Sequence, residues 1–577
     1  MTIFQKVYNI LTKKQQHKAI MLIFCMIIGA ILEAVGVGAI WPLMQMIGNE
    51  SYLKEHSILA TYVANFGIND DRQLIVIAAC LLIAFYLLKN IFCAFEIKLQ
   101  TNFIVLNQIE TAQKMLTYYL DKPYLYHVNH NSAILYRNID IGTNAIYSQL
   151  VISVLAIITE TITAIIIWLM VAFIEPTVAI IAALLLTIFI CLLMRQMRHK
   201  LAEKGDIKYK FSAQYLKWLS QALGSIKETK VMQKEPFFLE QFKQAYKGFG
   251  LASGDYMFLN QIPRMIIETA VLTALLLLVI FKVLNGEPVH NIVAVLSVLA
   301  LAAFRLMPCA NRIVGYWGTI KFHTPLFNEL YDDYIAIKNY SYLSLDNGAS
   351  AESMKFYSCI SFKDISFQYP ETTRPVLNHV NLSIPKGSFV GIVGSTGAGK
   401  TTFVDLLLGL LKPIQGNITV DGVDINNNIS GWRKNLAYVP QSIYLFDGTI
   451  KDNIEVGDAD ASNDKLDKIL RMAEIYDLVH TLPNGIDTVV GERGVKLSGG
   501  QKQRIGIARA LYCEPTVLIL DEATSALDNE VEASITETLL KLKGKITIIS
   551  IAHRLSTLET CDFKLKVDNG TVEVLKS

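Results

Sequence analysis

A nine-residue stretch, GSTGAGKTT at positions 394–402, constrains the fold of this chain more than any other part of the sequence. It fits the pattern G-x-x-x-x-G-K-[ST], in which glycines let the backbone curl so that successive N–H groups point at phosphate oxygens. The segment before it, GSFVGIVG, is typical of a buried strand, and TTFVDLLLGLL after it is typical of a helix whose N-terminus faces an anion. The alternative is a chance glycine-rich turn, which the flanking strand and helix argue against. The stretch therefore predicts an α/β domain with a phosphate-binding loop.

A second motif, VLILDEATSALD, places two acidic residues at the end of an apolar run. Asp521 at the strand end is suited to bind Mg²⁺ through water, and Glu522 is a candidate general base for a water that attacks a γ-phosphate. In the loop, Lys400 would reach the β- and γ-phosphates and the Thr401 hydroxyl would coordinate Mg²⁺. Acidic pairs follow apolar strands in many α/β proteins, so this motif has weight only together with the loop.

Further motifs carry a resemblance to a known family. LSGGQKQR occupies positions 497–504, and the sequence resembles the ABC ATPase family, whose signature is LSGGQ. Other pieces of that family fall in order: Tyr369 in FQYP, Gln441 in YVPQ, GERG at 491–494, SALD at 525–528 and His553 in IAHR. The resemblance covers residues 355–577.

The resemblance implies a mechanism in which two copies of the domain enclose two ATP molecules head to tail, so a homodimer is expected. The loop of one copy would face the signature of the other, whose serine and glycine N–H groups donate to the γ-phosphate. The implied nucleotide-binding residues are Tyr369, Gly394, Ser395, Thr396, Gly397, Ala398, Gly399, Lys400, Thr401, Thr402, Ser498, Gly499, Gly500 and Gln501. The implied Mg²⁺ ligands are Thr401, Gln441 and Asp521, and the implied catalytic residues are Glu522, His553 and Gln441.

The first three hundred residues are mostly apolar. The chain is 52% hydrophobic and 18% charged, which lies outside the average of soluble proteins. Hydrophobic runs predict six membrane spans, at 19–47, 74–95, 150–174, 177–194, 266–281 and 292–304. The first run could pass for a signal peptide, but Glu33 interrupts it and no small-residue cleavage site follows.

Charge sets the expected orientation. The N-terminus and the segment after the fourth run are basic, so the N-terminus, residues 96–149, residues 195–261 and the ATPase domain are expected in the cytosol, on the inner side of the cell membrane. The net charge of +2 gives no reason to expect a nucleic-acid partner. The eight cysteines form no C-x-x-C pair, so neither a zinc site nor a disulfide framework is suggested.

The arrangement of predicted spans resembles that of ABC exporter half-transporters. We expect an α-helical transmembrane domain at 1–330, with long cytoplasmic helical extensions, a linker at 331–354 and an α/β ATPase domain at 355–577. The resemblance implies short transverse helices at 123–131 and 219–227 that plug into the ATPase domains. Residues 1–18 predict an interfacial amphipathic helix, and 56–66 an external helix, with simple packing as the alternative for the latter.

The cargo is the least constrained part of the prediction. RLMPCANRI at 305–313 and the segment around Glu33 are similar to PglK-type flippases of lipid-linked oligosaccharides. That resemblance implies an amphipathic, lipid-linked diphosphate substrate near Arg305, Arg312 and Glu33, and an arginine fork suits a diphosphate. The alternatives are structural ion pairs between a membrane glutamate (Glu33 or Glu160) and Arg305, or arginines that serve only as topology anchors. At the level of function, the alternatives are a peptide or drug exporter and an ATP-gated channel.

Overall fold

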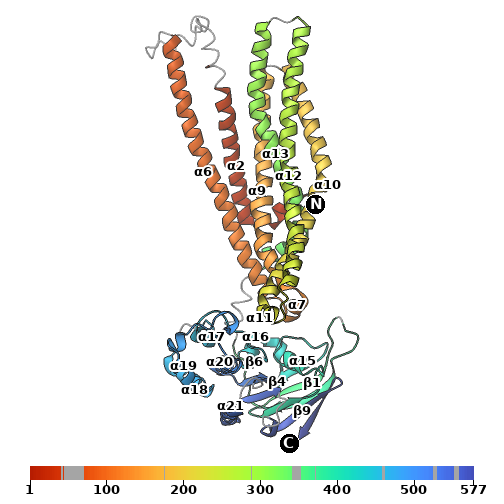
Figure 1. Cartoon of the computed structure of the whole chain (residues 1–577), viewed down its shortest axis with the longest axis vertical. Coiled ribbons are helices and arrows are strands. Elements are labelled where there is room, and N and C mark those ends of the chain that lie inside the picture. The colour runs from red at the N-terminus through yellow and green to blue at the C-terminus, as the bar shows by residue number, and fades with distance from the viewer. Residues whose placement is uncertain are drawn as a thin grey trace. The chain divides into compact units, whose positions relative to one another are not determined.

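The computed structural model describes residues 1–39, 43, 71–174, 176–286, 289–340, 352–370, 372–457, 462–523, 529–551 and 558–576. The chain divides into two compact units (Figure 1). The first comprises Met1–Leu120 and His130–Tyr340, and the second comprises Asp121–Asn129 and Ser341–Ser577. The short segment Asp121–Asn129 thus leaves the helical unit and belongs to the unit that carries the phosphate-binding loop.

The first unit consists of helices. Its elements are α1 (Ile3–Ile10), α2 (Lys13–Gly38), α6 (Asp71–Leu120), α8 (Ser132–Arg137), η1 (Asn138–Gly142), η2 (Ala145–Val151), α9 (Ile152–Ile174), α10 (Pro176–Gly224), α11 (Ile226–Val231), α12 (Glu235–Leu284) and α13 (Val289–Asn339). In Figure 1 the long helices run alongside one another: α10 packs against α12 and α13, and α2 packs against α6 and α9.

Four of these helices are far longer than a bilayer requires. The helices α6, α10, α12 and α13 have 49 to 51 residues each. At 1.5 Å per residue each extends about 75 Å, whereas the hydrocarbon core needs about 20 residues. The predicted helical extensions beyond the membrane are therefore present in the structure.

The membrane spans are supported in part. Four stretches of the described residues are long and apolar enough to cross a membrane: Lys13–Gly36, Arg72–Leu120, Ser132–Leu169 and Glu235–Leu284. Helices α10 and α13 lie at the fourth and sixth predicted spans, but several of their side chains there fall outside the described residues, so the count of six stays a prediction. The predicted external helix at 56–66 also lies outside the described part of the chain.

The N-terminal helix α1 is amphipathic, as its sequence predicts. Val7, Ile10 and Leu11 are buried, while Phe4 is exposed. Thr2 and Gln5 form a capping box that satisfies the first N–H groups of the helix. Lys6 Nζ donates to Asn328 Oδ1 at 2.7 Å, so a polar contact ties α1 to α13.

Of the two predicted transverse helices, the first is a short helix at its predicted position and the second is displaced. The first is α7 (Tyr124–Asn129), inside the predicted 123–131. The second is α11, which begins at Ile226, because α10 continues through Gly224 and takes up most of the predicted 219–227. In α7 an aliphatic residue, Leu125, packs against the core of the second unit, whereas Tyr124 is 44% exposed.

The second unit is built on two sheets. One is antiparallel, with strand order β2-β1-β4-β5, and the other has the order β10-β9-β3-β8-β7-β6. The strands are β1 (Cys359–Phe367), β2 (Leu377–Pro385), β3 (Phe389–Val393), β4 (Gln415–Val420), β5 (Val423–Asp424), β6 (Leu436–Val439), β7 (Val517–Asp521), β8 (Thr547–Ile551), β9 (Phe563–Asp568) and β10 (Thr571–Lys576). Strands β9, β3, β8, β7 and β6 are mutually parallel, and β10 runs antiparallel to β9.

Helices complete this unit. They are α15 (Lys400–Leu407), η3 (Ile425–Asn428), α16 (Ile429–Arg433), α17 (Ile450–Glu455), α18 (Asn463–Met472), α19 (Tyr476–Thr481), η4 (Gly485–Asp487), η5 (Glu492–Gly494), α20 (Gly499–Tyr512) and α21 (Asn529–Leu542). The three central parallel strands, β3, β7 and β8, are almost wholly buried, as expected of strands that read as continuous apolar runs. Ligands of such sheets bind at the carboxyl ends of the strands, which directs attention to the loops after β3, β6 and β7.

Candidate nucleotide site

The predicted phosphate-binding loop connects β3 to α15, in the strand–loop–helix order that its sequence predicts. Gly397 and Gly399 have φ angles of +82° and +104°, a region that side chains with a Cβ rarely adopt. Gly399 is also the N-cap of α15, and a Cβ added there would lie 3.0 Å from Val376 Cγ1. The glycines are thus required by the backbone path that brings the loop to the N-terminus of α15, where unpaired N–H groups favour an anion.

Lys400 lies in the first turn of α15 and is buried. Its ammonium donates to the carbonyl oxygens of Gly394 at 2.8 Å and Ser395 at 3.1 Å, so it folds back over its own loop. Neutral carbonyl groups hold this charge, and an anionic phosphate is a stronger acceptor for it.

The acidic pair lies at the carboxyl end of β7, beside the end of β6. Asp521 Oδ2 accepts a hydrogen bond from the Tyr438 hydroxyl at 3.2 Å, and Glu522 Oε2 accepts one from Gln441 Nε2 at 2.7 Å. Glu522 has a φ of +50°, and its backbone N–H donates to the Ile551 carbonyl at 3.0 Å. A left-handed glutamate backbone is unfavourable by itself, and such strain is typical of functional sites. Glu522, Gln441 and Asp521 are therefore brought together as the sequence predicts.

Electrostatics at this site favour a cation. Burial raises the pKa of Asp521, and burial together with Asp521 raises the pKa of Asp405 to about 6. Asp405 is buried and Asp521 is half-buried, and a divalent cation beside Asp521 would offset the repulsion that Asp521 exerts on Asp405. The residues present therefore fit Mg²⁺, with Thr401, Gln441 and Asp521 as its candidate ligands.

The remaining predicted nucleotide residues are only partly assembled within one chain. The Tyr369 hydroxyl lies 3.2 Å from Thr402 Oγ1, which places this aromatic residue beside the loop. Ser498 caps α20, and its hydroxyl accepts the Gln501 N–H at 3.3 Å. Among the described residues, no hydrogen bond joins Ser498 to the loop at 394–402. His553 and the SALD motif at 525–528 lie outside the described residues.

The residues predicted to face the cargo lie in the helical unit. Arg312 Nε is 2.6 Å from Glu160 Oε1, so Arg312 forms an ion pair with a membrane glutamate, and the pairing predicted for Arg305 stays a prediction. Glu33 lies close enough to act on Arg312 electrostatically. The side chain of Arg305 falls outside the described residues, although α13 includes its backbone.

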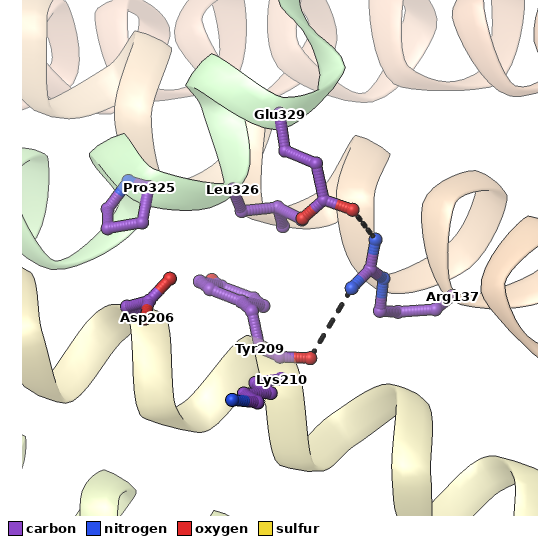
Figure 2. A pocket seen from close by; sticks show the side chains of 7 residues that line it. All are labelled: Arg137, Asp206, Tyr209, Lys210, Pro325, Leu326 and Glu329. Atoms are coloured by element: carbon purple, nitrogen blue, oxygen red, sulfur yellow. Dashed lines mark hydrogen bonds and ion pairs between the residues drawn. The ribbon is translucent and has the colours of Figure 1, made fainter.

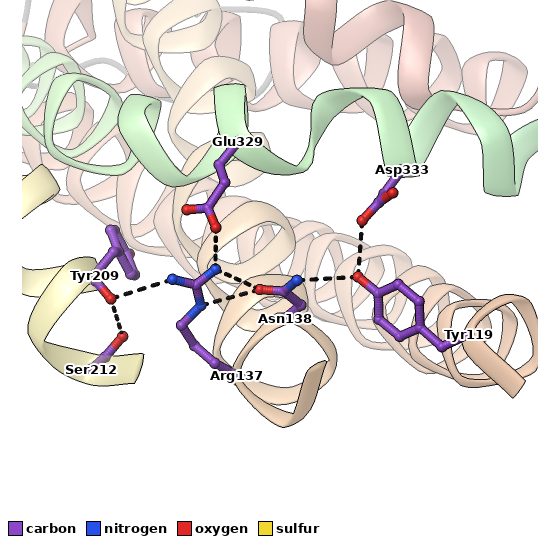
Figure 3. Close-up of polar contacts among 7 residues, drawn as sticks. All are labelled: Tyr119, Arg137, Asn138, Tyr209, Ser212, Glu329 and Asp333. Atoms are coloured by element: carbon purple, nitrogen blue, oxygen red, sulfur yellow. Dashed lines mark hydrogen bonds and ion pairs between the residues drawn. The ribbon is translucent and has the colours of Figure 1, made fainter. Parts of the chain in front are cut away.

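A second polar cluster of the helical unit was not singled out from the sequence. Arg137, only 4% exposed, donates to Asn138 Oδ1 at 3.1 and 2.7 Å, to the Tyr209 carbonyl at 3.4 Å and to Glu329 (Figure 3). It borders a cavity of 390 Å³ lined by Arg137, Asp206, Tyr209, Lys210, Pro325, Leu326 and Glu329 (Figure 2). The guanidinium is already satisfied by protein groups, which indicates a structural brace rather than a ligand site.

Two residues of the nucleotide site were also missed. Tyr438 begins the YVPQ segment but was assigned no role, and Asp405 belongs to no quoted motif; each is a polar residue in an otherwise apolar stretch, LAYVP and TTFVDLLLGLL. A polar group in a buried segment needs a partner, so this anomaly is the signal that could have indicated them.

Comparisons with known proteins agree with this site. Residues 377–525 match the ABC transporter family. A Bacillus subtilis protein described as an uncharacterized ABC transporter ATP-binding protein is 45% identical over 215 residues, 37% of each chain. The ATP-dependent lipid A-core flippase of Vibrio cholerae is 40% identical over 229 residues, 39% of each chain. These matches therefore span less than half of the length of either relative.

The likeness of the whole chain is one of fold. A solved bacterial Atm1-family ABC exporter with ATP bound superimposes with a TM-score of 0.77 at 24% identity, over 98% of this chain and 95% of that one. The chain thus has an ABC transporter domain that follows a helical unit in the sequence, and it has the fold of an Atm1-family ABC exporter.

Proposed function

We propose that this chain is one half of a homodimeric transporter that uses ATP hydrolysis to export or flip an amphipathic, lipid-linked substrate across the cell membrane. The observation that carries the proposal is the meeting of the loop at 394–402, Gln441 and the Asp521–Glu522 pair at neighbouring strand ends of one sheet. The N-terminus and the ATPase domain lie in the cytosol, as the loop charges favour.

The site residues have distinct roles in this proposal. Lys400 and the loop N–H groups bind the phosphates of ATP, and Tyr369 stacks on adenine. Glu522 accepts the proton of the attacking water, while His553 holds that water in line with the γ-phosphate. Mg²⁺, held by Thr401, Gln441 and Asp521, supplies charge neutralisation between the phosphates.

The hydrogen bond from Gln441 to Glu522 joins a proposed metal ligand to the proposed base. While the amide donates to Glu522 Oε2, one acceptor of the base is occupied. A Gln441 side chain recruited to Mg²⁺ would release that oxygen for water. The same glutamine would thereby link metal binding to the availability of the base.

The dimer follows from the incomplete site. Ser498 presents the N-terminus of α20, a 14-residue helix, to an anion. Because this donor has no bond to the loop of its own chain, a second copy would bring Ser498, Gly499 and Gly500 to the γ-phosphate.

A complementation experiment tests this arrangement. One copy carries Ser498→Arg and the other Lys400→Ala, and each alone is expected to be nearly inactive. Co-expressed, they retain one intact composite site, so ATPase activity should return to half of the parental rate or less. Failure of the mixture to regain activity would contradict the shared site, and so would full activity of a proven monomer.

For the cargo, we propose a polyprenyl-diphosphate-linked glycan, with Arg305, Arg312 and Glu33 facing it. Purified protein in liposomes should hydrolyse ATP faster with such a lipid, and should move it across the bilayer. Stimulation by amphipathic peptides or drugs, with none by the glycan lipid, would instead favour the peptide or drug exporter. If the protein hydrolyses ATP but moves none of these substrates across the bilayer, the result would favour the ATP-gated channel.

A further inference from the structure

Two consecutive carboxylates at the end of β7 are each held by a donor from the end of β6. The Tyr438 hydroxyl donates to Asp521 Oδ2 at 3.2 Å, three residues before Gln441, which donates to Glu522. We propose that Tyr438 is a positioning residue that fixes the Asp521 carboxylate for Mg²⁺. This inference rests on the proposed ATP hydrolysis and gives a role to Tyr438, the first residue of the YVPQ segment, to which neither the sequence motifs nor the comparisons assign one.

The strand pairing explains why Asp521 needs such a partner. Its backbone pairs with Ile551 of β8, which fixes the main chain on one side. On the other side, β6 runs parallel to β7 and pairs Tyr438 with Ile519, two residues before Asp521. The tyrosine side chain is long enough to reach diagonally to the end of the neighbouring strand, where a shorter residue would not.

The direction of the hydrogen bond is settled by chemistry. An ionised carboxylate can only accept, so the tyrosine must donate. A tyrosine hydroxyl is neutral at physiological pH, so it has the proton that this bond needs. The bond is therefore a charge-assisted one, which is stronger than a bond between neutral groups.

A neighbouring charge gives the bond something to oppose. Asp405 of α15 is 9% exposed and lies within electrostatic reach of Asp521. Repulsion between the two carboxylates would favour other orientations of the Asp521 side chain. The Tyr438 hydroxyl holds Asp521 Oδ2 against this repulsion, which lowers the reorganisation that Mg²⁺ binding must overcome.

The ring of Tyr438 has a separate, structural role. Side chains alternate along β6: Ala437 and Val439 face one core, while Leu436 and Tyr438 pack against the other. Tyr438→Phe therefore keeps the packing and removes only the hydroxyl. Tyr444→Phe is a matched control, because Tyr444 lies a few residues further along the chain and is 58% exposed.

The test measures metal dependence in the full-length protein. Binding of a fluorescent ATP analogue is titrated with Mg²⁺, and ATP turnover is measured over the same Mg²⁺ range. For Tyr438→Phe we expect the half-saturating Mg²⁺ concentration to rise about 10-fold, from the loss of a hydrogen bond to a charged group. Affinity for the analogue without Mg²⁺, and turnover at saturating Mg²⁺, should stay within about twofold of the parent.

Each outcome decides between the roles. An unchanged half-saturating Mg²⁺ concentration in Tyr438→Phe overturns the proposal, whether or not thermal stability falls, because a purely structural hydroxyl would alter melting alone. An equal rise in Tyr444→Phe also overturns it, since the effect would then not be specific to the Asp521 contact. If the parent itself shows no Mg²⁺-dependent binding, the proposed ATPase function fails instead.

Discussion

The nucleotide site and the Arg137 cluster are both dense in charge, yet their hydrogen bonds are of opposite kinds. In the cluster, Arg137 is shared among Asn138, the Tyr209 carbonyl and Glu329, and Asn138 continues to the Tyr119 hydroxyl. These partners come from different helices, α8, η1, α6, α10 and α13, so the network joins elements that are distant in the sequence (Figure 3).

In the nucleotide site the bonds are replaceable, and those of Lys400 are also local. Lys400 is bound by carbonyl groups of its own loop, and Gln441 by a carboxylate that has another task in hydrolysis. A phosphate or a metal ion offers each of them a stronger partner. The difference suggests a criterion. A buried charged side chain whose hydrogen-bond partners come from distant elements stabilises the fold. One whose partners belong to its own loop is available to bind a ligand.

The largest effect should come from Glu522→Gln. The amide cannot accept a proton from water, so ATP turnover should fall about 10²–10⁴-fold. The variant should still bind ATP and melt within a few degrees of the parent, since the amide can keep its contact with Gln441. The exposed Glu530→Gln is the control. Near-parental turnover would remove Glu522 as the base.

The Arg137 cluster should respond in the opposite way. Arg137→Met removes bonds to three groups and leaves the Asn138 amide oxygen buried without this donor, which should destabilise the helical unit by about 3 kcal/mol, while the Tyr209 carbonyl still accepts from the Ser212 hydroxyl. Glu329→Gln, at a side chain that is 50% exposed, retains an acceptor and should cost about 1 kcal/mol or less. Thermal melting in detergent measures both.

The affinity of the Arg137→Met and Glu329→Gln variants for ATP tests whether the cluster acts on the fold alone. If Arg137 braces the fold, the ATP affinity of the surviving folded protein should be unchanged. A stable Arg137→Met protein with impaired substrate-stimulated hydrolysis would contradict the brace and make the adjoining cavity a binding site.

The particular residues show where sequence was sufficient. Phosphate chemistry demands given residue types at given spacings, so the loop at 394–402, Gln441 and the Asp521–Glu522 pair were predictable, as were the strand and helix around the loop. Arg137, by contrast, lies in SAILYRNID, which has no motif, and its partners are 72 and 192 residues away. The same reason hid the pairing of Arg312 with Glu160: hydropathy indicates that a membrane helix forms, but not which faces meet.

A buried histidine extends the brace and gives it a pH dependence. The ring of His323 of α13, beyond the predicted sixth span, is hydrogen-bonded to the Tyr209 hydroxyl, and burial with nearby Lys208 lowers its pKa to about 3. Between about pH 6.5 and 3, His323 is protonated in the unfolded chain but neutral in the folded chain. The free energy of unfolding therefore decreases as the pH falls through this range. From pH 6.5 to 5 the loss should be about 2 kcal/mol.

Melting temperatures at pH 7 and pH 5 test this prediction. His323→Gln cannot titrate, so its melting temperature should depend less on pH than that of the parent, even if it is lower at pH 7. His480→Gln, at an exposed position of α19, should retain the parental pH dependence. If the melting temperatures of the parent and of His323→Gln depend equally on pH, protonation of His323 does not lower the free energy of unfolding, and the prediction is wrong.

The smallest expected effect is that of changing Arg312 or its partner. By the criterion above, Arg312 has features both of a side chain that stabilises the fold and of one that binds a ligand. Its partner Glu160 comes from a distant helix, as in a brace, but the Arg312 side chain is 43% exposed, as in a site. If Arg312 binds a diphosphate, Glu160 competes with the substrate for the same guanidinium. Glu160→Gln should then lower the half-saturating concentration of glycan lipid for ATPase stimulation a few-fold, and Arg312→Lys should raise it, because an ammonium lacks the bidentate fork. If the pair is a brace, both variants should lower the melting temperature and leave that concentration unchanged. Stimulation curves and melts on the same preparations separate the two, and a shift in neither would remove Arg312 from both roles.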